Sequence, residues 1–555
     1  MRSSWTVALG LACILGPLGA CSSDEAPTPE TDEPEATLDE YQTRGTCAGL
    51  PRLPLETPAG VCVGLVASGL KFPRGIAQLP NGDLVLADMG GWALNKGSVW
   101  LFARGANGTY AKRQILSQID KPSGIAVGPD NLVYVATPAD IFRFDPYETG
   151  RPQPRLKLVV RNLLGGEGAR HPLHHLAFDP KNPWQLYVNI GSDSDMCESE
   201  QFAAPCNEAE RAAPRGAIYH YDLSAGDHLA TGFTVAARGL RNSMALAFHP
   251  ASGTLLQGEN ARDSIDKRDP SLRDLEGELP HEELNVIEPG AHYGWPYCYD
   301  NGVASPEYPG YDCSSTKTPA MLLPGHVAPL GMEYYQGDLF PPAYRGNLIV
   351  GFHGYRANGH RIVMVPVDDR GVPNGEIRDL VRGWEKTATQ PQGAPVDVLV
   401  GQDGSIFVTE DKNGTILKLS FDASAGAGTP LVPKPPVTPV MTAEERVRCE
   451  ALATKSGTLA SLQRDVLDAA CVSCHGAGPG YAGGLALLRC DDVGNATRLR
   501  ENRRTGGPLV KPNDEDSELV KRLEGDGFPQ MPAGGISPEQ MAEVLAWIRA
   551  GAPTR

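Results

Sequence analysis

The sequence predicts an all-β six-bladed propeller followed by a small all-α domain. Between about residue 60 and residue 420, a short apolar strand, a turn rich in Pro, Asn, Asp or Gly, and a second β-rich strand recur six times. From Thr442 onward the spacing of apolar residues becomes helical. The chain has 555 residues, which is also too long for a single hydrophobic core.

The six repeats share the same strand-turn-strand pattern and lie at Gly75–Ala87, Gly124–Ala136, His175–Val188, Ala245–Gln257, Pro329–Gly351 and Val396–Val408. Six units of four-strand size favour a propeller over residues 45–422, because radial closure removes open sheet edges. A sandwich or a solenoid is the structural alternative. Two long inserts, Asp193–Arg215 and Asp263–Pro280, are expected as loops on the top or rim, where such folds carry their chemistry.

The first 21 residues have the pattern of an export signal. Met1-Arg2 precedes an apolar run that ends in Leu-Gly-Ala-Cys at residues 18–21 and is too short to span a bilayer. This ending resembles the lipobox of bacterial lipoproteins, which implies a lipid anchor on Cys21; a plain secretory signal is the alternative. The same resemblance to bacterial lipoproteins implies, because Ser22 rather than Asp follows the cysteine, a place at the outer membrane, on its periplasmic or surface face. Residues 22–44, acidic and rich in Pro and Thr, are expected to form a disordered tether.

Charge and cysteine content narrow the possible partners. A formal net charge of −17 makes nucleic acid an unsuitable partner, because the chain would repel phosphate backbones. Outside the signal and the motif at 471–475, eight cysteines remain, which indicates an oxidising compartment. They fall into local pairs, 47 with 62, 197 with 206, 298 with 313 and 449 with 490, although sequence alone does not fix the connectivity. A metal cluster is disfavoured because none of the eight has Cys-x-x-Cys spacing.

A second domain is predicted at residues 442–555, after a linker at 423–441 rich in Pro. Its final helix is expected to begin at Ser537-Pro538, an N-cap followed by a proline in the first turn.

The motif Cys-Val-Ser-Cys-His at 471–475 predicts a covalent haem c. The thiols of Cys471 and Cys474 add to the haem vinyl groups, and His475 supplies an axial nitrogen. Met531, on a proline-stiffened loop, is the expected sixth ligand, whereas Met541 lies on an apolar helix face. A structural disulfide or a zinc knuckle is the alternative. Residues 445–553 resemble the monohaem cytochromes c appended to bacterial oxidoreductases.

The propeller carries motifs that resemble a known enzyme family. His171 opens a segment that leads to Leu-Tyr-Val-Asn-Ile-Gly-Ser at 186–192, and Gly-Leu-Arg-Asn at 239–242 and Tyr-Gly-Trp-Pro at 293–296 follow. Together they resemble the soluble glucose and sorbosone dehydrogenases, six-bladed propellers that hold pyrroloquinoline quinone over calcium. The resemblance covers most of residues 60–420.

The resemblance implies a role for each matching residue. His171 would be the general base for a substrate hydroxyl, a task suited to imidazole near neutral pH. Arg241 would pair with the oxyanion or carboxylate of the quinone, Asn242 would hydrogen-bond its oxygens, and Trp295 would contact it. The alternatives are that His171 caps a strand, Arg241 forms a structural ion pair and Trp295 is core.

The resemblance also implies calcium ligands and one departure. The carbonyls of Ala261 and Arg262, with Asn260 and Glu282, occupy the calcium stretch of the family, although the second insert interrupts it. Where the family places an arginine that grips the carboxylates of the cofactor, this chain has Ala394. Arg356 or Arg361 is a possible substitute, since a tricarboxylate needs cations but not from one fixed strand.

These features predict an exported, lipid-anchored quinohaemoprotein. It would oxidise a sugar, polyol or aldehyde, pass the electrons to its own haem c, and deliver them to a downstream periplasmic acceptor. The alternative is a propeller without quinone that binds a carbohydrate or a protein beside an electron-relay cytochrome c.

Overall fold

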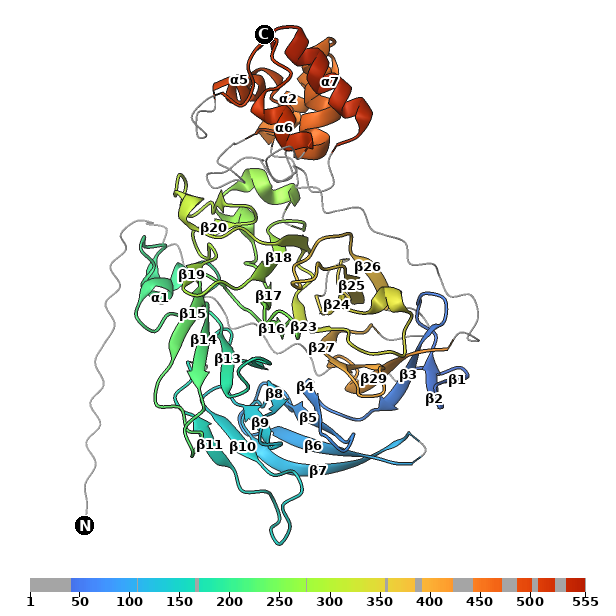
Figure 1. The fold of residues 1–555 in the computed structure, drawn as a ribbon. Coiled ribbons are helices and arrows are strands. Elements are labelled where there is room, and N and C mark those ends of the chain that lie inside the picture. The colour runs from blue at the N-terminus through green and yellow to red at the C-terminus, as the bar shows by residue number, and fades with distance from the viewer. Residues whose placement is uncertain are drawn as a thin grey trace, which may run out of the picture. The chain divides into compact units, whose positions relative to one another are not determined.

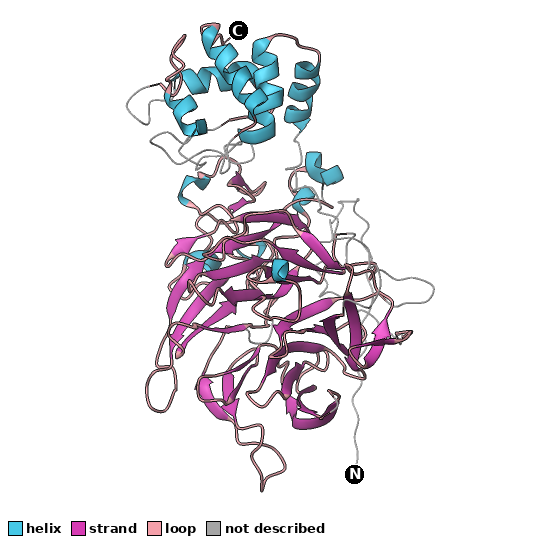
Figure 2. Cartoon of the chain, turned by 45° about the vertical axis from the view of Figure 1, so that its right-hand side comes forward, coloured by secondary structure: helices cyan, strands magenta, loops and turns pink. Residues whose placement is uncertain are grey.

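The computed structural model describes residues 41–554 apart from 107, 165–168, 276, 355–357, 385–391, 423–442, 472–486, 502–507 and 525–535. Strands predominate up to Phe421, and helices follow from Ala443 (Figures 1 and 2). In the described part of the chain, no helix is both long and apolar enough to cross a membrane.

The first three blades of the propeller are antiparallel sheets whose strands follow one another in chain order. The first blade contains β4 (Pro73–Gln78), β5 (Leu84–Asp88), β6 (Gly97–Arg104) and β7 (Tyr110–Ile119). The second contains β8 (Ile125–Val127), β9 (Val133–Ala136), β10 (Ile141–Phe144) and β11 (Lys157–Val160). The third contains β12 (Leu176–Phe178), β13 (Gln185–Ile190), β14 (Ala217–Asp222) and β15 (Thr234–Arg238), with the short β19 (Ala291–His292) added in parallel.

The remaining blades continue this arrangement (Figure 1). The fourth contains β16 (Ala245–Phe248), β17 (Leu255–Glu259), β18 (His281–Val286) and β22 (Met321–Gly325). The fifth contains β23 (Pro329–Tyr334), β24 (Leu348–Phe352), β25 (Arg361–Val365) and β26 (Arg378–Val381). The sixth contains β27 (Pro395–Val400), β28 (Ile406–Glu410), β29 (Thr415–Phe421) and β3 (Val61–Ala67). A separate hairpin joins β20 (Cys298–Tyr299) to β21 (Val303–Ala304).

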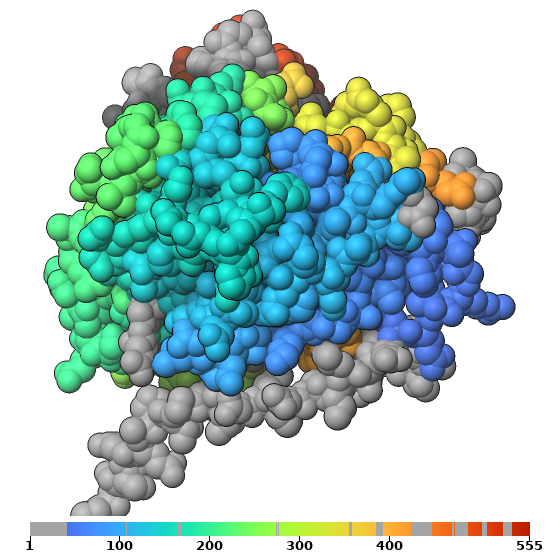
Figure 3. Space-filling model, turned by 90° about the horizontal axis from the view of Figure 1, so that it is seen from below, coloured from blue at the N-terminus to red at the C-terminus, as the bar shows by residue number. Residues whose placement is uncertain are grey.

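The ring closes through the N-terminal part of the described chain. β3 pairs antiparallel with β29, so the outer strand of the sixth blade comes from before the first blade. The hairpin of β1 (Thr46–Cys47) and β2 (Leu50–Leu53) extends this sheet, and the Cys47–Cys62 disulfide ties β1 to β3. In the space-filling view, orange residues near 400 lie beside the blue N-terminal residues (Figure 3). This pairing removes the open edge that the first and last blades would otherwise present.

The predicted six-bladed propeller is confirmed. Each of the six repeats forms the two inner strands of one blade, and the inner strands of neighbouring blades contact one another around the ring. These strands are buried on both faces; β5, for example, is buried at every position. Burial on both faces explains why the repeats read as apolar runs rather than as a strict alternation. The copy beginning at Pro329, degenerate in sequence, forms a complete blade.

The two inserts leave the ends of inner strands. The first follows β13 and contains η1 (Glu198–Glu200) and α1 (Asn207–Glu210). The second follows β17 and contains η2 (Ile265–Lys267) and η3 (Pro270–Leu275). All four predicted cysteine pairs are disulfides: 47 with 62, 197 with 206, 298 with 313 and 449 with 490. Two short 3₁₀ helices, η4 (Cys313–Ser315) and η5 (Pro342–Tyr344), complete the propeller.

The C-terminal part is helical, as predicted. Its helices are α2 (Ala443–Ala453), α3 (Thr458–Ser461), the π-helix η6 (Leu462–Cys471), α5 (Asp492–Glu501), α6 (Glu518–Glu524) and α7 (Pro538–Arg549). Trp547 and Ile548 of α7 pack with Val466 and Leu467 of η6 in one buried cluster. Ser537 and Gln540 form the predicted capping box of α7. Cys471 ends η6, while Cys474, His475 and Met531 lie outside the described residues, so the haem c assignment stays a prediction.

Candidate active site

One end of the ring carries all the candidate residues of the propeller. We call it the site face; it consists of the segments that enter the first strand of each blade and those that leave the second strand. His171 and Arg241-Asn242 enter β12 and β16, while both inserts leave β13 and β17. Because the strands of a blade alternate in direction, all these segments meet at the same end of the ring.

His171 is held by the residue that follows β13. Its Nδ1 lies 2.9 Å from the backbone carbonyl oxygen of Ser192 and 3.0 Å from the Ser192 hydroxyl oxygen. A carbonyl oxygen only accepts hydrogen bonds, so Nδ1 carries the proton and Nε2 is left with its lone pair. Burial lowers the pKa of His171 well below its usual value, and the positive charge of Arg241 lowers it further. The ring is therefore neutral at pH 7 and is ready to accept a proton at Nε2.

Asn242 lies close to His171 because Gly191 separates them. A Cβ at Gly191 would lie 2.4 Å from the His171 Cβ and 3.2 Å from the Asn242 Oδ1. Any larger residue at 191 would push these two groups apart. The Asn242 Oδ1 is buried and has no hydrogen-bond partner among the described residues. The predicted base and the predicted cofactor contact are therefore brought together, and one polar atom beside them is unsatisfied.

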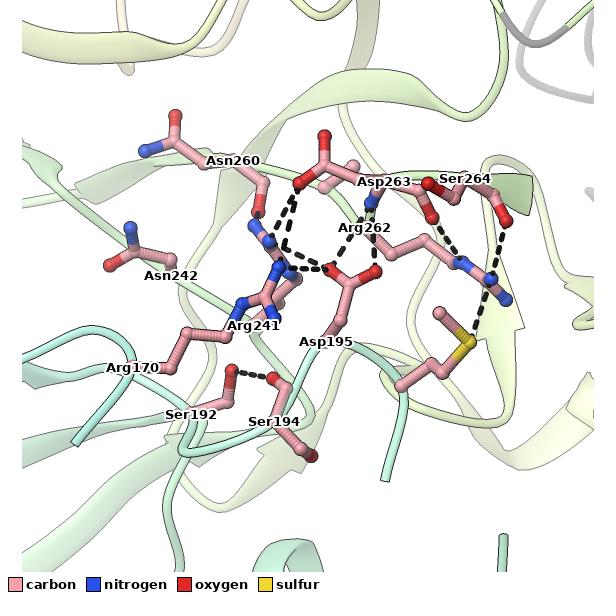
Figure 4. Close-up of polar contacts among 12 residues, drawn as sticks. Arg170, Ser192, Ser194, Asp195, Arg241, Asn242, Asn260, Arg262, Asp263 and Ser264 are labelled. Carbon is pink, nitrogen blue, oxygen red and sulfur yellow. Dashed lines mark hydrogen bonds and ion pairs between the residues drawn. The ribbon is translucent and has the colours of Figure 1, made fainter. Parts of the chain in front are cut away.

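Arg241 is 5% exposed and lies between the two inserts (Figure 4). Its Nη2 is 2.7 Å from Asp195 Oδ1 of the first insert and 3.2 Å from Asp263 Oδ2 of the second. Its Nη1 donates to the Asn260 carbonyl at 3.1 Å. The Nε of this guanidinium is buried without a partner among the described residues. Arg241 therefore forms structural ion pairs and has one buried donor that no described residue uses.

Two further residues support the Arg241 turn. Glu259, the last residue of β17, accepts the backbone N–H groups of Arg241 and Asn242. Trp295 donates its indole N–H to the Asp195 carbonyl at 2.8 Å and packs among buried cysteines and tyrosines. Burial raises the pKa of Glu259 to about 7. Sequence reasoning missed Glu259 and Asp195, although Asp195 lies near the start of the first insert and Glu259 lies just before the second.

The predicted calcium residues lie next to a buried group of carboxylates. The Asn260 carbonyl is used by Arg241, and the Arg262 guanidinium pairs with Glu307, whereas Glu282 accepts the Ala261 N–H. Glu259, Glu282 and Glu283 are all buried, and burial raises the pKa of Glu282 and Glu283 well above the usual value. A small cavity of about 30 Å³ is lined by Glu259, Glu283, Ala261 and Tyr293.

This group of carboxylates fits a hard cation. Calcium prefers six to eight oxygen ligands, and a cation would offset the cost of burying three carboxylates. The buried side-chain oxygens of Asn260 and Asn285 have no partner in the described part of the chain. Cys197, Glu200 and Cys206 also lie close enough together to suggest a metal site, but the two sulfurs form a disulfide and are not thiolates.

The other side of the site face, around Ala394, is closed by internal contacts. Ala394 is 0% exposed and its N–H donates to Glu410 at 2.9 Å. Asn413 donates to the Gln392 carbonyl, and the ring of His360 lies 2.6 Å from the Gly393 carbonyl. Of the suggested substitutes, Arg361 pairs with Asp379 at 3.1 Å, and Arg356 lies outside the described residues.

Arg74, which sequence reasoning missed, supplies a cation on the site face. It stands at the start of β4, is 6% exposed, and its Nη1 lies 2.9 Å from Asp411 Oδ2. The Nε2 of His353 lies 3.0 Å from the other oxygen of Asp411. The Arg74 Nε is buried without a partner among the described residues. Its sequence signal is weak: an arginine near the start of a short strand that also contains Ile76 and Ala77.

These residues fit an anionic quinone in part. Pyrroloquinoline quinone carries three carboxylates, and Arg74 and Arg241 each have a buried donor that no described residue uses. Asn242 and the neutral His171 add polar groups that match a quinone and a hydroxylated substrate. The cation expected at residue 394 is absent, so the cradle differs from the family pattern at that position.

Comparison with known proteins supports the propeller fold and a likeness to sugar dehydrogenases. The TrAA12-like family matches residues 55–311. An uncharacterised protein of Borreliella burgdorferi is 26% identical over 66% of this chain and 91% of its own length. The pyrroloquinoline quinone-dependent pyranose dehydrogenase of Coprinopsis cinerea is 24% identical over 67% of this chain, which spans only 55% of that enzyme. The aldose sugar dehydrogenase YliI of Escherichia coli is 24% identical over 65% of this chain and 94% of its own length.

Solved structures give the same fold. A family AA12 carbohydrate-active enzyme of Trichoderma reesei aligns with a TM-score of 0.54 at 21% identity, over 66% of this chain and 98% of that one. The pyrroloquinoline quinone domain of the Coprinopsis cinerea pyranose dehydrogenase aligns with a TM-score of 0.52 at 18% identity, over 67% of this chain and 99% of that one. The N-terminal part of the protein is therefore a six-bladed propeller similar to those of the soluble quinone-dependent sugar dehydrogenases.

Proposed function

We propose that the protein is a sugar dehydrogenase in which the propeller oxidises a sugar, polyol or aldehyde with pyrroloquinoline quinone. The observation that carries the proposal is the convergence of His171, Asn242 and Arg241 on the site face. There a neutral imidazole with a free Nε2 stands beside a buried oxygen and a buried N–H that have no partner in the described chain. A histidine that merely capped a strand would not need such neighbours.

Each residue then has one task. The quinone, when bound, supplies a two-electron acceptor for the hydride of a substrate C–H bond. His171 accepts the proton of the substrate hydroxyl at Nε2, while Ser192 keeps the other ring nitrogen protonated. Arg241 and Arg74 attract the negatively charged groups of the cofactor, and their fixed guanidinium groups stabilise charge that develops during reduction. Asn242 orients the polar edge of the bound ligand.

We further propose that calcium binds beside this cradle. The carboxylates of Glu259 and Glu282, with the carbonyls of Ala261 and Arg262 and the side chain of Asn260, offer the oxygen ligands that calcium prefers. Glu259 also holds the Arg241–Asn242 turn, so a cation here would fix the turn as well as the cofactor.

The electron outlet and the membrane attachment belong to the same proposal. The motif at 471–475 would bind haem c, with His475 and Met531 as axial ligands, and a His/Met pair raises the potential so that the haem accepts electrons. The two electrons of each turnover would leave one at a time, first to this haem and then to a periplasmic acceptor. A lipid on Cys21 would hold the protein at the outer membrane.

A titration and a spectrum together test this function. The purified full chain is given calcium and pyrroloquinoline quinone, and binding is followed by the quenching of tryptophan fluorescence. A panel of aldoses is then added while the α-band of reduced haem is recorded. We expect saturable binding of the quinone and a haem band that develops with at least one sugar. No quinone binding together with no reduction by any sugar would refute the dehydrogenase.

One observation favours a rival function. Ala394 is fully buried where the resembling family has an arginine, and the chain around it is satisfied internally. A propeller that binds a carbohydrate without quinone would be consistent with this closed region. In that case sugars would bind in the titration, but the quinone would not, and the haem would stay oxidised on addition of sugar.

A further inference from the structure

The first insert carries a buried carboxylate that has no part in the proposed reaction so far. Glu208 lies on α1, is 4% exposed, and directs both carboxylate oxygens to one turn of the chain. Its Oε1 accepts the backbone N–H groups of Asp193 and Ser194, and its Oε2 accepts the Ser194 hydroxyl at 2.6 Å. Three donors that converge on one carboxylate hold it firmly, because hydrogen bonds to a charged acceptor are the stronger kind.

The turn held by Glu208 leads directly to the base. The Ser194 carbonyl accepts the Ser192 hydroxyl at 2.6 Å, as Figure 4 shows. Since the hydroxyl proton is used there, Ser192 Oγ presents only lone pairs to His171 Nδ1. The Ser192 carbonyl oxygen is the second acceptor at the same nitrogen. The carbonyl favours the Nδ1-protonated ring, and the position of Ser194 decides whether the Ser192 hydroxyl supports this form or competes with it.

We propose that Glu208 is a positioning residue that fixes the tautomer of His171 through the turn at Asp193–Ser194 and through Ser192. With the turn in place, Nδ1 is protonated and Nε2 is the proton acceptor. If the turn moved, the Ser192 hydroxyl would be free to donate to Nδ1 in competition with the carbonyl, and a share of the rings would carry the proton on Nε2. The effect on turnover rests on the proposed function, whereas the effect on the tautomer does not.

The insert is built to keep Glu208 and the turn together. The Cys197–Cys206 disulfide joins two residues at a sequence separation of 9, in the stretch between the turn and Glu208. The Cys197 N–H also donates to the Ser194 hydroxyl oxygen at 2.9 Å. Glu200 accepts the Asn207 and Glu208 N–H groups and so anchors the start of α1. Ser192 also donates its N–H to the Arg241 carbonyl at 2.8 Å, which ties the turn to the neighbouring blade. The insert thus links the base and Arg241.

The substitution Glu208→Gln tests the proposal with little change in volume. An amide offers N–H groups where the carboxylate received three donors, so one of these donors loses its acceptor. The histidines of the full chain are labelled with ¹⁵N, and the ring nitrogen shifts of His171 are identified by their absence in His171→Gln. We expect a single Nδ1-protonated form in the original protein and a mixture of both tautomers in Glu208→Gln, measured above the pKa of His171.

Glu210→Gln is the matched control. Glu210 lies on the same helix, but its side chain pairs with His292 and Arg238 rather than with the turn. We expect this variant to keep the original tautomer. Ser194→Ala, which removes only one of the three donors to Glu208, is a milder second variant and should give a smaller share of the Nε2-protonated form.

Two outcomes would overturn the positioning role: an unchanged His171 tautomer in both Glu208→Gln and Ser194→Ala, or the same change in Glu210→Gln. If the original protein also oxidises sugars, kcat should fall about three- to tenfold in Glu208→Gln with KM unchanged, a small part of the contribution of a general base. If no sugar is oxidised, the proposed function fails, but the tautomer measurement still decides the role of Glu208.

Discussion

The two sides of the site face are built in opposite ways. Around the third and fourth blades, two long inserts converge on Arg241 and leave its Nε and the Asn242 Oδ1 without described partners. Around the sixth blade, the described residues near Ala394 bond mainly to one another, and Ala394 is completely enclosed. Buried polar atoms without partners are costly in a scaffold and are useful where a ligand will meet them. The difference places most of the proposed ligand chemistry on the first side and structural support on the second, where Arg74 is the one residue to which we give a ligand-binding role.

We call the side around the third and fourth blades the open side and the side around the sixth blade the closed side. On the open side, the largest expected change in turnover is that of His171→Gln. Loss of a general base costs roughly 10²–10⁴-fold in kcat, whereas quinone binding should stay close to that of the original protein. Because burial and Arg241 lower the pKa of His171, the acid limb of the rate profile of the original protein should lie below pH 6.5. Stopped-flow reduction of the haem by substrate measures both effects.

His174→Gln is the control for this prediction. His174 is buried, and its ring nitrogens bond to the carbonyls of Asn189 and Pro138, so its loss should lower stability rather than chemistry. Substrate-driven reduction that persists in His171→Gln at the original rate would contradict the assignment of the base.

Arg74→Gln tests whether Arg74, from the first blade, binds the quinone. The resembling family has an arginine for this task where this chain has Ala394. Loss of a hydrogen bond from a charged donor costs about 1.5–3 kcal/mol, so the quinone should bind roughly 10- to 100-fold more weakly. Arg74→Lys keeps the positive charge but loses the paired N–H donors of the guanidinium. Its quinone affinity should lie between those of the original protein and Arg74→Gln. Fluorescence titration with the quinone measures the affinity.

Arg143→Gln controls for the loss of a buried ion pair as such. Arg143 pairs with Asp130 at 2.7 Å in the second blade, away from the site face. Both glutamine variants should lose stability, but only Arg74→Gln should lose affinity. If Arg74→Gln and Arg143→Gln bound the quinone with equal affinity, Arg74 would have only a structural role, like the other residues of the closed side.

The six blades could be predicted from the sequence more fully than the closure of the ring or the residues of the candidate site. Inner strands are apolar on both faces, so six repeats gave six blades, but the pairing of β3 with β29 depends on ring closure and has no local pattern. His171, Arg241 and Asn242 were found because each lies in a short motif. Arg74 was not, because its partner Asp411 is 337 residues away and only the folded ring brings the two together.

The inserts were the least predictable part of the site. Their length indicated loops on the site face, and that expectation holds. Which of their many acidic residues matter depends on burial, since Asp195 is enclosed with Arg241 while the Asp263 side chain is 50% exposed. No sequence pattern separates these two aspartates, because both follow the end of a strand within a few residues.

The closed side makes a prediction about pH. Burial, together with the negative charge of Asp411, raises the pKa of Glu410 to about 7. The folded state therefore holds more protons than the unfolded state between pH 4.5 and 7, and the free energy of unfolding should fall as pH rises through this range. Urea unfolding at several pH values measures the slope. A contribution that instead rose with pH would mean that the donors around Glu410 outweigh its burial.

Apart from its own comparison variant, the smallest effect expected is that of Tyr41→Phe, which removes a single hydroxyl from the closed side. This hydroxyl accepts the Trp384 indole N–H at 2.8 Å and an Asn413 N–H at 3.0 Å, and donates to Glu410 at 3.3 Å. Buried donors that lose their acceptor cost about 1–3 kcal/mol, so the midpoint of urea unfolding should fall by a corresponding amount. Loss of the hydrogen bond that Tyr41 donates to Glu410 should also raise the pKa of Glu410. The pH range over which stability changes should then extend to higher pH.

Tyr147→Phe provides the comparison, because the hydroxyl of the exposed Tyr147 also bonds to a carboxylate, that of Asp83, at 2.6 Å. Water replaces that partner, so the loss of stability should be smaller. Quinone affinity distinguishes support from ligand binding: it should be unchanged in Tyr41→Phe if the closed side is scaffold alone. A weaker affinity in this variant would mean that the end of the predicted tether helps to bind the quinone, and the contrast between the two sides would then fail.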